Sequence, residues 1–185
     1  MANTLPIVHE GGLDFELFIS EAELKAAVDS LAERINHDYE GREPLFVCVL
    51  NGAFLFAADL FRRITLHSQM TFVRLCSYTG LGTSGEVRVM MGLTNDEVRD
   101  KDVIVLEDIV DTGYSMHYFL QTLQQAGAHS VAVCSCLFKP EALLCPDARP
   151  KYVGIEIRKR FILGYGMDLD GFGRNLPAVY VLSEA

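Results

Sequence analysis

The sequence of 185 residues lacks any apolar run long enough to cross a membrane, since its longest apolar runs have the length of single strands. It also lacks the basic-then-apolar pattern of a secretory signal at its N-terminus. We therefore expect no membrane contact and a place in the cytoplasm. Repeats, low-complexity tracts and long linkers are absent too, so we expect one domain over residues 1–185 with a sizeable core.

Basic residues are in the minority: 16 Lys and Arg stand against 25 Asp and Glu, which gives a formal net charge of −9. This balance argues against a broad nucleic-acid-binding face, and we expect no nucleic-acid partner. It leaves room for a local basic pocket that binds phosphate.

Cysteines are few and odd in number, and they give no sign of a disulfide framework. Cys134 and Cys136 have the spacing of neighbours on a strand rather than that of a zinc knuckle. We expect reduced, mostly buried thiols in a cytosolic protein. The five are Cys48, Cys76, Cys134, Cys136 and Cys145.

Short apolar runs alternate with helical patterns, which indicates an α/β fold with a mostly parallel, twisted sheet flanked by helices. A capping box at Ser20–Glu23 opens the first helix. Residues 1–19 stay open between an arm that packs on a neighbour and a frayed end. The predicted helices run from about 21 to 41, 53 to 63 and 115 to 126, the predicted strands cover 45–50, 71–78, 87–91, 103–106, 130–138 and 153–157, and 79–86 is predicted to be a mobile loop.

The most informative stretch begins with a buried strand at Val103–Leu106, which delivers two acids, Glu107 and Asp108. These acids would repel phosphate, so we expect them to face sugar hydroxyls or a hard cation such as Mg²⁺. Two residues later comes the run Asp111-Thr112-Gly113-Tyr114-Ser115 at a helix start. Backbone N–H groups and hydroxyls at such a turn bind phosphate, and Gly113 allows close approach or a positive φ.

Two further groups of polar residues follow predicted strands. Leu50-Asn51-Gly52 ends one strand and Lys139 ends another. Because ligands bind at the carboxyl ends of parallel strands, these residues and the run after Val103–Leu106 are expected to converge on one site.

The run Leu106-Glu107-Asp108-Ile109-Val110-Asp111-Thr112-Gly113 resembles the signature of the phosphoribosyltransferases that use 5-phosphoribosyl 1-pyrophosphate (PRPP). In this full form it resembles the hypoxanthine-guanine branch, and the likeness extends from about Gly41 to Glu184 with the motifs in family order. It implies a type I phosphoribosyltransferase fold with a flexible lid and a small hood, formed by N-terminal residues and about residues 150–185.

The resemblance also implies a PRPP site. Leu50, Asn51 and Gly52 match the loop that holds pyrophosphate, which in this family contains a cis peptide between its first two residues. Arg174 resembles the arginine that contacts pyrophosphate. Ser77 and Tyr78, with the glycine-rich stretch after them, resemble the lid that excludes water from an oxocarbenium-like centre.

The purine side is implied in the same way. Lys139 would donate to the 6-oxygen of hypoxanthine or guanine and would disfavour adenine, because an ammonium has only donors. Phe161 resembles the aromatic that stacks on the purine, and Ile162 the residue whose backbone meets the base edge. Asp168 resembles the acid that orders a metal-bound water, with its backbone near the purine.

The implied reaction joins hypoxanthine, and guanine as well, to PRPP, giving IMP or GMP and pyrophosphate in purine salvage, with Mg²⁺ as cofactor. Asp111 is the expected acid near purine N7, accepting or sharing its proton as N9 attacks C1′. Members of the family form dimers and tetramers, and either assembly is expected here. Glu107, Asp108 and Asp168 are the expected metal residues, and Thr112, Gly113, Tyr114 and Ser115 are expected to hold the 5′-phosphate.

Two departures and two alternatives remain. Human-type members of the family carry lysine at the positions of Asn51 and Tyr114, which leaves backbone binding intact but puts side-chain contacts in question. One alternative is a nucleotide-sensing regulatory protein on the same fold that binds RNA, against which the acidic balance argues. The other is a receiver-type signalling domain, whose acid pair would lie early in the chain rather than past its middle.

Overall fold

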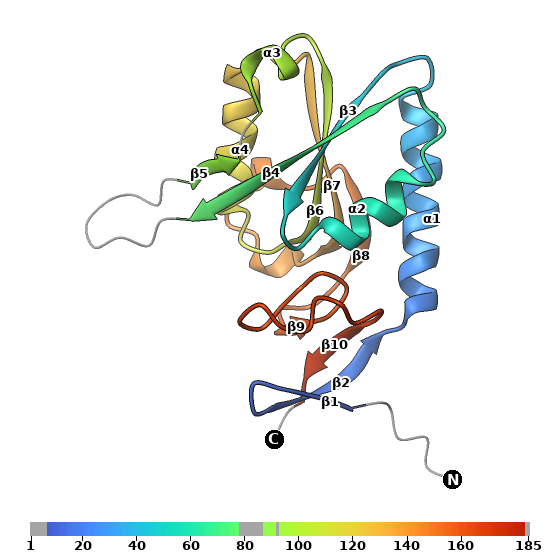
Figure 1. Cartoon of the computed structure of the whole chain (residues 1–185), viewed down its shortest axis with the longest axis vertical. Helices are drawn as coiled ribbons and strands as arrows, with labels where there is room; N and C mark the ends of the chain where they lie inside the picture. Colours follow the sequence, from blue (N-terminus) through green and yellow to red (C-terminus); the bar gives the residue numbers. More distant parts are fainter. Residues whose placement is uncertain (1–6, 78–86, 92, 184–185) are drawn as a thin grey trace, which may run out of the picture.

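The computed structural model describes residues 7–77, 87–91 and 93–183, and it contains two sheets of different size (Figure 1). The larger is a six-stranded sheet in the order β5-β4-β3-β6-β7-β8. Five neighbouring strands run parallel, namely β4, β3, β6, β7 and β8. The edge strand β5 pairs with β4 in the antiparallel direction. The strands are β3 (Leu45–Leu50), β4 (Gln69–Ser77), β5 (Val87–Met91), β6 (Asp102–Val110), β7 (Ser130–Phe138) and β8 (Tyr152–Glu156).

Helices cover both faces of this sheet. On one face α1 (Glu21–Asp38) and α2 (Phe54–Phe61) pack on side chains such as Phe46 and Leu106. On the other face α3 (Asn95–Val98) and α4 (Tyr114–Gln125) pack on Val47 and its neighbours. Alternate residues of one strand therefore enter two different cores, as period-two side-chain geometry requires. Two short 3₁₀ helices, Pro140–Ala142 and Pro146–Ala148, follow β7.

The capping box predicted for the first helix is present. The Ser20 hydroxyl accepts a hydrogen bond from the Glu23 N–H at 3.3 Å, and the Glu23 carboxylate accepts one from the Ser20 N–H at 2.9 Å. Two of the N–H groups that a helix start leaves without partners are satisfied in this way.

The smaller sheet forms a hood at one end of the molecule, below the main sheet in Figure 1. Its order is β1-β2-β10-β9, all antiparallel, and Phe15, Leu163 and Tyr180 fill a small core of its own. Residues 7–19, which the sequence left open, therefore supply two hood strands. The strands are β1 (Ile7–Glu10), β2 (Leu13–Ile19), β9 (Ile162–Leu163) and β10 (Val179–Leu182).

The α/β fold with a mostly parallel sheet is as predicted. The structure differs from the prediction in where single strands end and where the hood begins. β6 continues through Val110, so Glu107 and Asp108 lie within the strand rather than after it. β8 pairs with β7, so residues 152–156 belong to the main sheet, although the hood was expected to begin near 150. Tyr78 and the loop 79–86 lie outside the described residues, and Ser77 is the last residue of β4. Within the described ranges, no helix has the length and apolar character needed to cross a membrane.

Candidate active site

The candidate site lies where the carboxyl ends of three adjacent strands meet. β3 ends at Leu50, β6 at Val110 and β7 at Phe138, and these strands are neighbours in the parallel sheet. Val110 lies opposite Phe138, so the residues that follow them, Asp111 and Lys139, leave the sheet side by side. The sequence elements predicted to converge do so, because parallel strands present their carboxyl ends at one edge.

The loop after β3 touches the acids of β6 directly. The Leu50–Asn51 peptide bond is cis, as the resemblance implied. A Cβ atom added to Gly52 would lie 1.8 Å from Oδ2 of Asp108, so the loop backbone passes against this carboxylate with no space for a side chain. The two motifs, which are more than fifty residues apart in the chain, thus form one surface.

Glu107 and Asp108 are adjacent and partly buried, so two negative charges in these carboxyl groups would repel each other. Burial raises the pKa of Glu107 well above its usual range, and the neighbouring Asp108 carboxylate adds to the shift. Burial also raises the pKa of Asp108, while hydrogen bonds with Glu107 and the Ile109 N–H and the charge of Arg174 oppose this rise. Oδ1 of Asp108 accepts a hydrogen bond from the Ile109 N–H at 2.8 Å. Ribose hydroxyls or a cation would relieve the repulsion between the two carboxylates.

Asp111 and Lys139 form an ion pair at this edge. Nζ of Lys139 lies 2.7 Å from Oδ2 of Asp111, and only 7% of the Lys139 surface is exposed. A buried ammonium needs such a partner, since an unpaired buried charge is strongly unfavourable. A donor and a proton acceptor are therefore held next to each other and next to the turn that starts α4.

A buried serine shapes the end of β6. Ser135 on β7 is fully buried; its hydroxyl accepts a hydrogen bond from the Val110 N–H at 3.1 Å and donates one to the Leu137 carbonyl. The hydroxyl is thus inserted between two backbone groups at the point where β6 leaves the sheet. It satisfies both of them and sets the direction in which Asp111 departs.

The turn after Asp111 presents an open helix N-terminus. Gly113 has a left-handed backbone with φ of +83° and makes no side-chain cap of α4. The first N–H groups of a helix have no partners within the helix, so this end offers donors and a partial positive charge to an anion. Thr112, Tyr114 and Ser115 around it are all exposed.

Arg174 and Asp168 face the site from the hood loop that follows β9. One nitrogen of the Arg174 guanidinium lies 2.6 Å from Oδ1 of Asp168, and another donates to the Gly166 carbonyl at 2.7 Å. Oδ2 of Asp168 accepts a hydrogen bond from the Gly171 N–H at 2.6 Å. The loop packs on the β3 loop, because a Cβ atom on Gly166 would lie 1.9 Å from the Gly52 carbonyl oxygen.

The two other purine candidates lie in the hood. The Phe161 side chain is 47% exposed and packs at a tilt against Phe15, with ring centroids 6.1 Å apart. Its carbonyl accepts a hydrogen bond from the Leu182 N–H at 3.0 Å. Ile162 is buried in β9, opposite Val181. Phe161 is thus an aromatic residue exposed enough to contact a planar ligand.

The described residues contain no cluster of three His, Cys, Asp or Glu side chains that could bind a metal by themselves. Glu107 and Asp108 are adjacent, whereas Asp168 is paired with Arg174. This donor set nevertheless fits Mg²⁺, which is usually bound by one or two carboxylates together with waters and substrate phosphates. Both carboxyl groups lie next to each other on β6, and burial raises the pKa of each.

Comparison with known proteins agrees with this geometry. The model of the phosphoribosyl transferase domain family matches residues 20–170. A hypoxanthine-guanine phosphoribosyltransferase of Streptococcus thermophilus (strain CNRZ 1066) is 36% identical over 171 residues, covering 91% of this chain and 93% of the relative. The chain belongs to the hypoxanthine-guanine phosphoribosyltransferases. A relative in this family from Bacillus subtilis (strain 168) is 33% identical over 92% of the chain and 94% of its own length.

Solved structures of the family have the same fold. A hypoxanthine phosphoribosyltransferase from Staphylococcus aureus superposes with a TM-score of 0.83 at 31% identity, covering 91% of each chain. A hypoxanthine-guanine phosphoribosyltransferase from Bacillus anthracis gives a TM-score of 0.82 at 32% identity, over 96% of this chain and 100% of that one. The hood, the main sheet and the loops between them therefore have the arrangement of the phosphoribosyltransferase family.

Three residues that the sequence did not single out shape this phosphoribosyltransferase site. Ser135 bonds the end of β6, Gly166 packs on the β3 loop, and the neighbouring Tyr165 bonds to Asp59 of α2. The glycines on both sides of Tyr165 were the available signal, since Gly-Tyr-Gly indicates an irregular backbone. Nothing in a single sequence distinguishes Ser135 from an ordinary strand serine.

Proposed function

We propose that this protein transfers the 5-phosphoribosyl group of PRPP to N9 of hypoxanthine, and of guanine, giving IMP or GMP and pyrophosphate. The observation that carries the proposal is the 2.7 Å ion pair of Lys139 and Asp111 beside the open N-terminus of α4. A 6-oxopurine needs a donor at its 6-oxygen and an acceptor near N7, and its phosphorylated partner needs an anion site close by. The names of the relatives support the same reaction.

PRPP would lie along the edge of the main sheet. Thr112–Ser115 hold the 5′-phosphate with backbone N–H groups and hydroxyls. Glu107 and Asp108 accept hydrogen bonds from the ribose hydroxyls, which relieves their mutual repulsion. The backbone of Leu50–Gly52 and the guanidinium of Arg174 hold the pyrophosphate.

The purine would lie between this edge and the hood. Phe161 stacks on the ring, and the backbone of Ile162 and Asp168 meets the base edge. An ammonium has three donors, so Lys139 can keep its bond to Asp111 and still donate to the 6-oxygen. As N9 attacks C1′, the bond from C1′ to the pyrophosphate oxygen breaks, and Asp111 accepts or shares the proton at N7. Ser77 and Tyr78 would belong to a lid that keeps water from the reacting carbon.

Glu107 and Asp108, with Asp168 through water, are the residues that would hold Mg²⁺. Bound there, the ion neutralises pyrophosphate and stabilises it as a leaving group. Asn51 and Tyr114, which replace lysines of human-type members, leave phosphate binding to the backbone and the hydroxyls. We further propose that the whole of residues 1–185 acts as one unit and works in the cytoplasm, where its thiols stay reduced; the four described cysteines are all free.

We also propose that the protein assembles as a homodimer or homotetramer. Phe54 and Phe72 support this proposal, because both side chains are large, apolar and exposed in the single chain. Light scattering after size-exclusion chromatography would measure the assembly, and a mass of one chain at micromolar concentration would contradict it.

Product analysis tests the reaction. Protein incubated with hypoxanthine, PRPP and Mg²⁺ should form IMP and pyrophosphate in equal amounts, and an excess of EDTA should abolish both. A regulatory protein without turnover would bind nucleotide and form neither product. RNA binding measured in the same preparation would then favour that alternative.

The variant Asp111→Asn tests the proton-transfer role. Asparagine keeps the size of the side chain but accepts no proton, so we expect kcat to fall by about 10²–10⁴-fold, the usual contribution of a general acid or base. The Michaelis constant for PRPP should change much less. Turnover close to that of the wild type would remove Asp111 from this role.

A further inference from the structure

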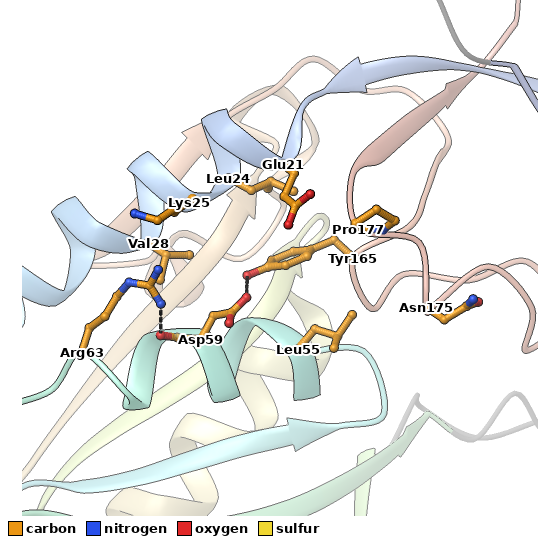
Figure 2. A pocket seen from close by; sticks show the side chains of 10 residues that line it. All are labelled: Glu21, Leu24, Lys25, Val28, Leu55, Asp59, Arg63, Tyr165, Asn175 and Pro177. Atoms are coloured by element: carbon orange, nitrogen blue, oxygen red, sulfur yellow. Dashed lines mark hydrogen bonds between the residues drawn. The ribbon is translucent and has the colours of Figure 1, made fainter.

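A pocket of about 310 Å³ lies between α1, α2 and the hood loop, which lines it with Tyr165, Asn175 and Pro177 (Figure 2). Figure 2 shows the Tyr165 ring crossing this pocket towards α2. Its hydroxyl donates a hydrogen bond to Oδ2 of Asp59 at 2.8 Å. The bond joins the hood loop to the helix that follows the pyrophosphate loop.

Tyr165 is held in one position at its backbone as well as at its hydroxyl. Its φ is +48°, and its N–H donates to the Leu176 carbonyl at 2.9 Å. Only 7% of its surface is exposed, and the ring belongs to the main core of the α1 and α2 face. The ring is therefore held both at the hood loop and at α2, and it joins the two.

The Asp59 end of the bond is anchored too. The Arg63 guanidinium donates to the Asp59 carbonyl at 2.6 Å and forms an ion pair with Asp29 of α1. α2 begins at Phe54, directly after the loop Leu50–Ala53. Asp59 is therefore part of a rigid connection between α1 and the pyrophosphate loop.

The residue after Tyr165 touches that loop. A Cβ atom on Gly166 would lie 1.9 Å from the Gly52 carbonyl oxygen, and the Gly166 carbonyl accepts the Arg174 hydrogen bond. One short stretch thus contacts α2 through Tyr165, the Gly52 backbone through Gly166, and the guanidinium of Arg174. Both groups proposed to hold pyrophosphate depend on its position.

We propose that the hydrogen bond from Tyr165 to Asp59 is a positioning contact that holds the hood loop against the pyrophosphate loop and thereby sets the affinity for PRPP. The inference rests on the proposed function, since it assumes that Gly52 and Arg174 bind pyrophosphate. Neither Tyr165 nor Asp59 touches the substrate in this account. The purine contacts of Lys139 and Asp111 follow β6 and β7 and should not depend on the bond, whereas Asp168, which pairs with Arg174 in the same loop, should shift with it.

The test is steady-state kinetics of Tyr165→Phe. The variant keeps the ring and loses only the hydroxyl, and we expect the Michaelis constant for PRPP to rise about five- to tenfold, which lies within the range for an ordinary hydrogen bond. The Michaelis constant for hypoxanthine should rise less than that for PRPP, because Lys139 and Asp111 keep their positions without the bond. Asp59→Ala should behave like Tyr165→Phe, the double variant should be no worse than either, and Asp59→Asn, which keeps an acceptor, should restore most of the PRPP affinity.

The matched control is Tyr152→Phe. The Tyr152 hydroxyl donates to Oδ2 of Asp38 at 2.6 Å, so it is also a buried tyrosine bonded to an aspartate of a helix, but it lies at the amino end of β8. We expect it to lower Tm as Tyr165→Phe does and to leave the Michaelis constant for PRPP unchanged. An unchanged constant in Tyr165→Phe, or an equal rise in both variants, would overturn the positioning role.

Calorimetric titration of PRPP with Mg²⁺ separates the two proposals. If the wild type turns over and Tyr165→Phe binds PRPP as tightly as the wild type does, only the positioning contact is wrong. If the wild type binds PRPP without turnover, the reaction is wrong, and a five- to tenfold weaker binding in Tyr165→Phe still supports the contact. If the wild type binds no PRPP, both proposals fall.

Discussion

At the scale of single residues, the site combines charges that the rest of the fold would not tolerate. Glu107 and Asp108 lie side by side within β6, partly buried, with raised pKa values. Lys139 and Ser135 are the buried polar residues of the described chain, and both contact the end of β6 or the residue after it. Such concentration of unfavourable groups in one place is typical of a site whose ligand supplies the missing partners.

The variant Glu107→Gln tests this charge imbalance in the free protein, with EDTA present. The raised folded-state pKa means that the folded protein holds this proton more tightly than the unfolded chain, so Glu107 destabilises the fold as pH rises above the usual glutamate value near 4.5. We expect Glu107→Gln to raise Tm by about 2–4 °C at pH 7.5, which corresponds to about 1 kcal/mol, while catalysis with PRPP falls at least about tenfold.

The change in Tm caused by Glu107→Gln should depend on pH. The gain in Tm should vanish below about pH 4, where both states carry the proton, grow as pH rises through the raised folded-state pKa, and then level off. Glu33→Gln on the exposed side of α1 is the control and should change Tm by less than about 2 °C at any pH. A Glu107→Gln protein less stable than the wild type at pH 7.5 would contradict the proposed repulsion.

At the scale of elements, the turn that joins β6 to α4 is the one proposed to hold phosphate through its backbone. Gly113 has a left-handed φ of +83°, and an added Cβ atom would lie 2.8 Å from the Leu143 side chain and 3.0 Å from that of Ala148. The turn is therefore clamped between the open end of α4 and the two 3₁₀ helices after β7. Its shape depends on a residue without a side chain at this position.

The variant Gly113→Ala should lower the free energy of unfolding by roughly 2–3 kcal/mol, about 1 kcal/mol from the left-handed backbone and the rest from the contacts. It should also weaken the binding of PRPP, because the N–H groups of the turn shift. Urea unfolding and the Michaelis constant for PRPP measure the two effects. Gly41→Ala, with φ of +77° and open space around it, should cost about 1 kcal/mol and leave PRPP affinity intact; equal losses in both variants would contradict the clamp at Gly113.

Most of the main sheet could be predicted from the sequence, because its strands are short, apolar and separated by clear helical patterns. The hood could not. β9 has only two residues, too few for a periodic signal. In β2, Leu13, Phe15 and Leu17 alternate with acids, which is the period of a half-buried strand, but this signal does not identify the partner, β10, which is distant from β2 in sequence. The position of Asp111 beside Lys139 followed from strand order, whereas the contact between Tyr165 and Asp59 depends on a loop with no pattern at all.

At the scale of the whole molecule, the candidate site lies between two sheets with separate cores. The main sheet supplies the acids, the phosphate turn and Lys139, and the hood supplies Phe161, Asp168 and Arg174. The Gly166 contact with Gly52 brings the two together. A ligand that bridges both parts should therefore stabilise the protein more than a ligand of either part alone.

PRPP with Mg²⁺ at about one hundred times its dissociation constant should stabilise the fold by about 2.7 kcal/mol and raise Tm by roughly 5–10 °C. Ribose 5-phosphate, which lacks pyrophosphate, should give a much smaller shift at the same concentration, because it leaves Arg174 and the Leu50–Gly52 loop without a partner. Differential scanning calorimetry would measure both. Equal shifts for the two ligands would mean that the pyrophosphate side of the site contributes nothing.

The most direct test of the central claim is an ultraviolet assay with PRPP and Mg²⁺ that offers hypoxanthine, guanine, xanthine, adenine and uracil separately. The geometry of Lys139 and Asp111 predicts metal-dependent turnover of hypoxanthine and guanine, with adenine and uracil inert, since an ammonium cannot accept the 6-amino hydrogen of adenine. Turnover of adenine at a rate similar to that of hypoxanthine, or no turnover of any base, would contradict the account.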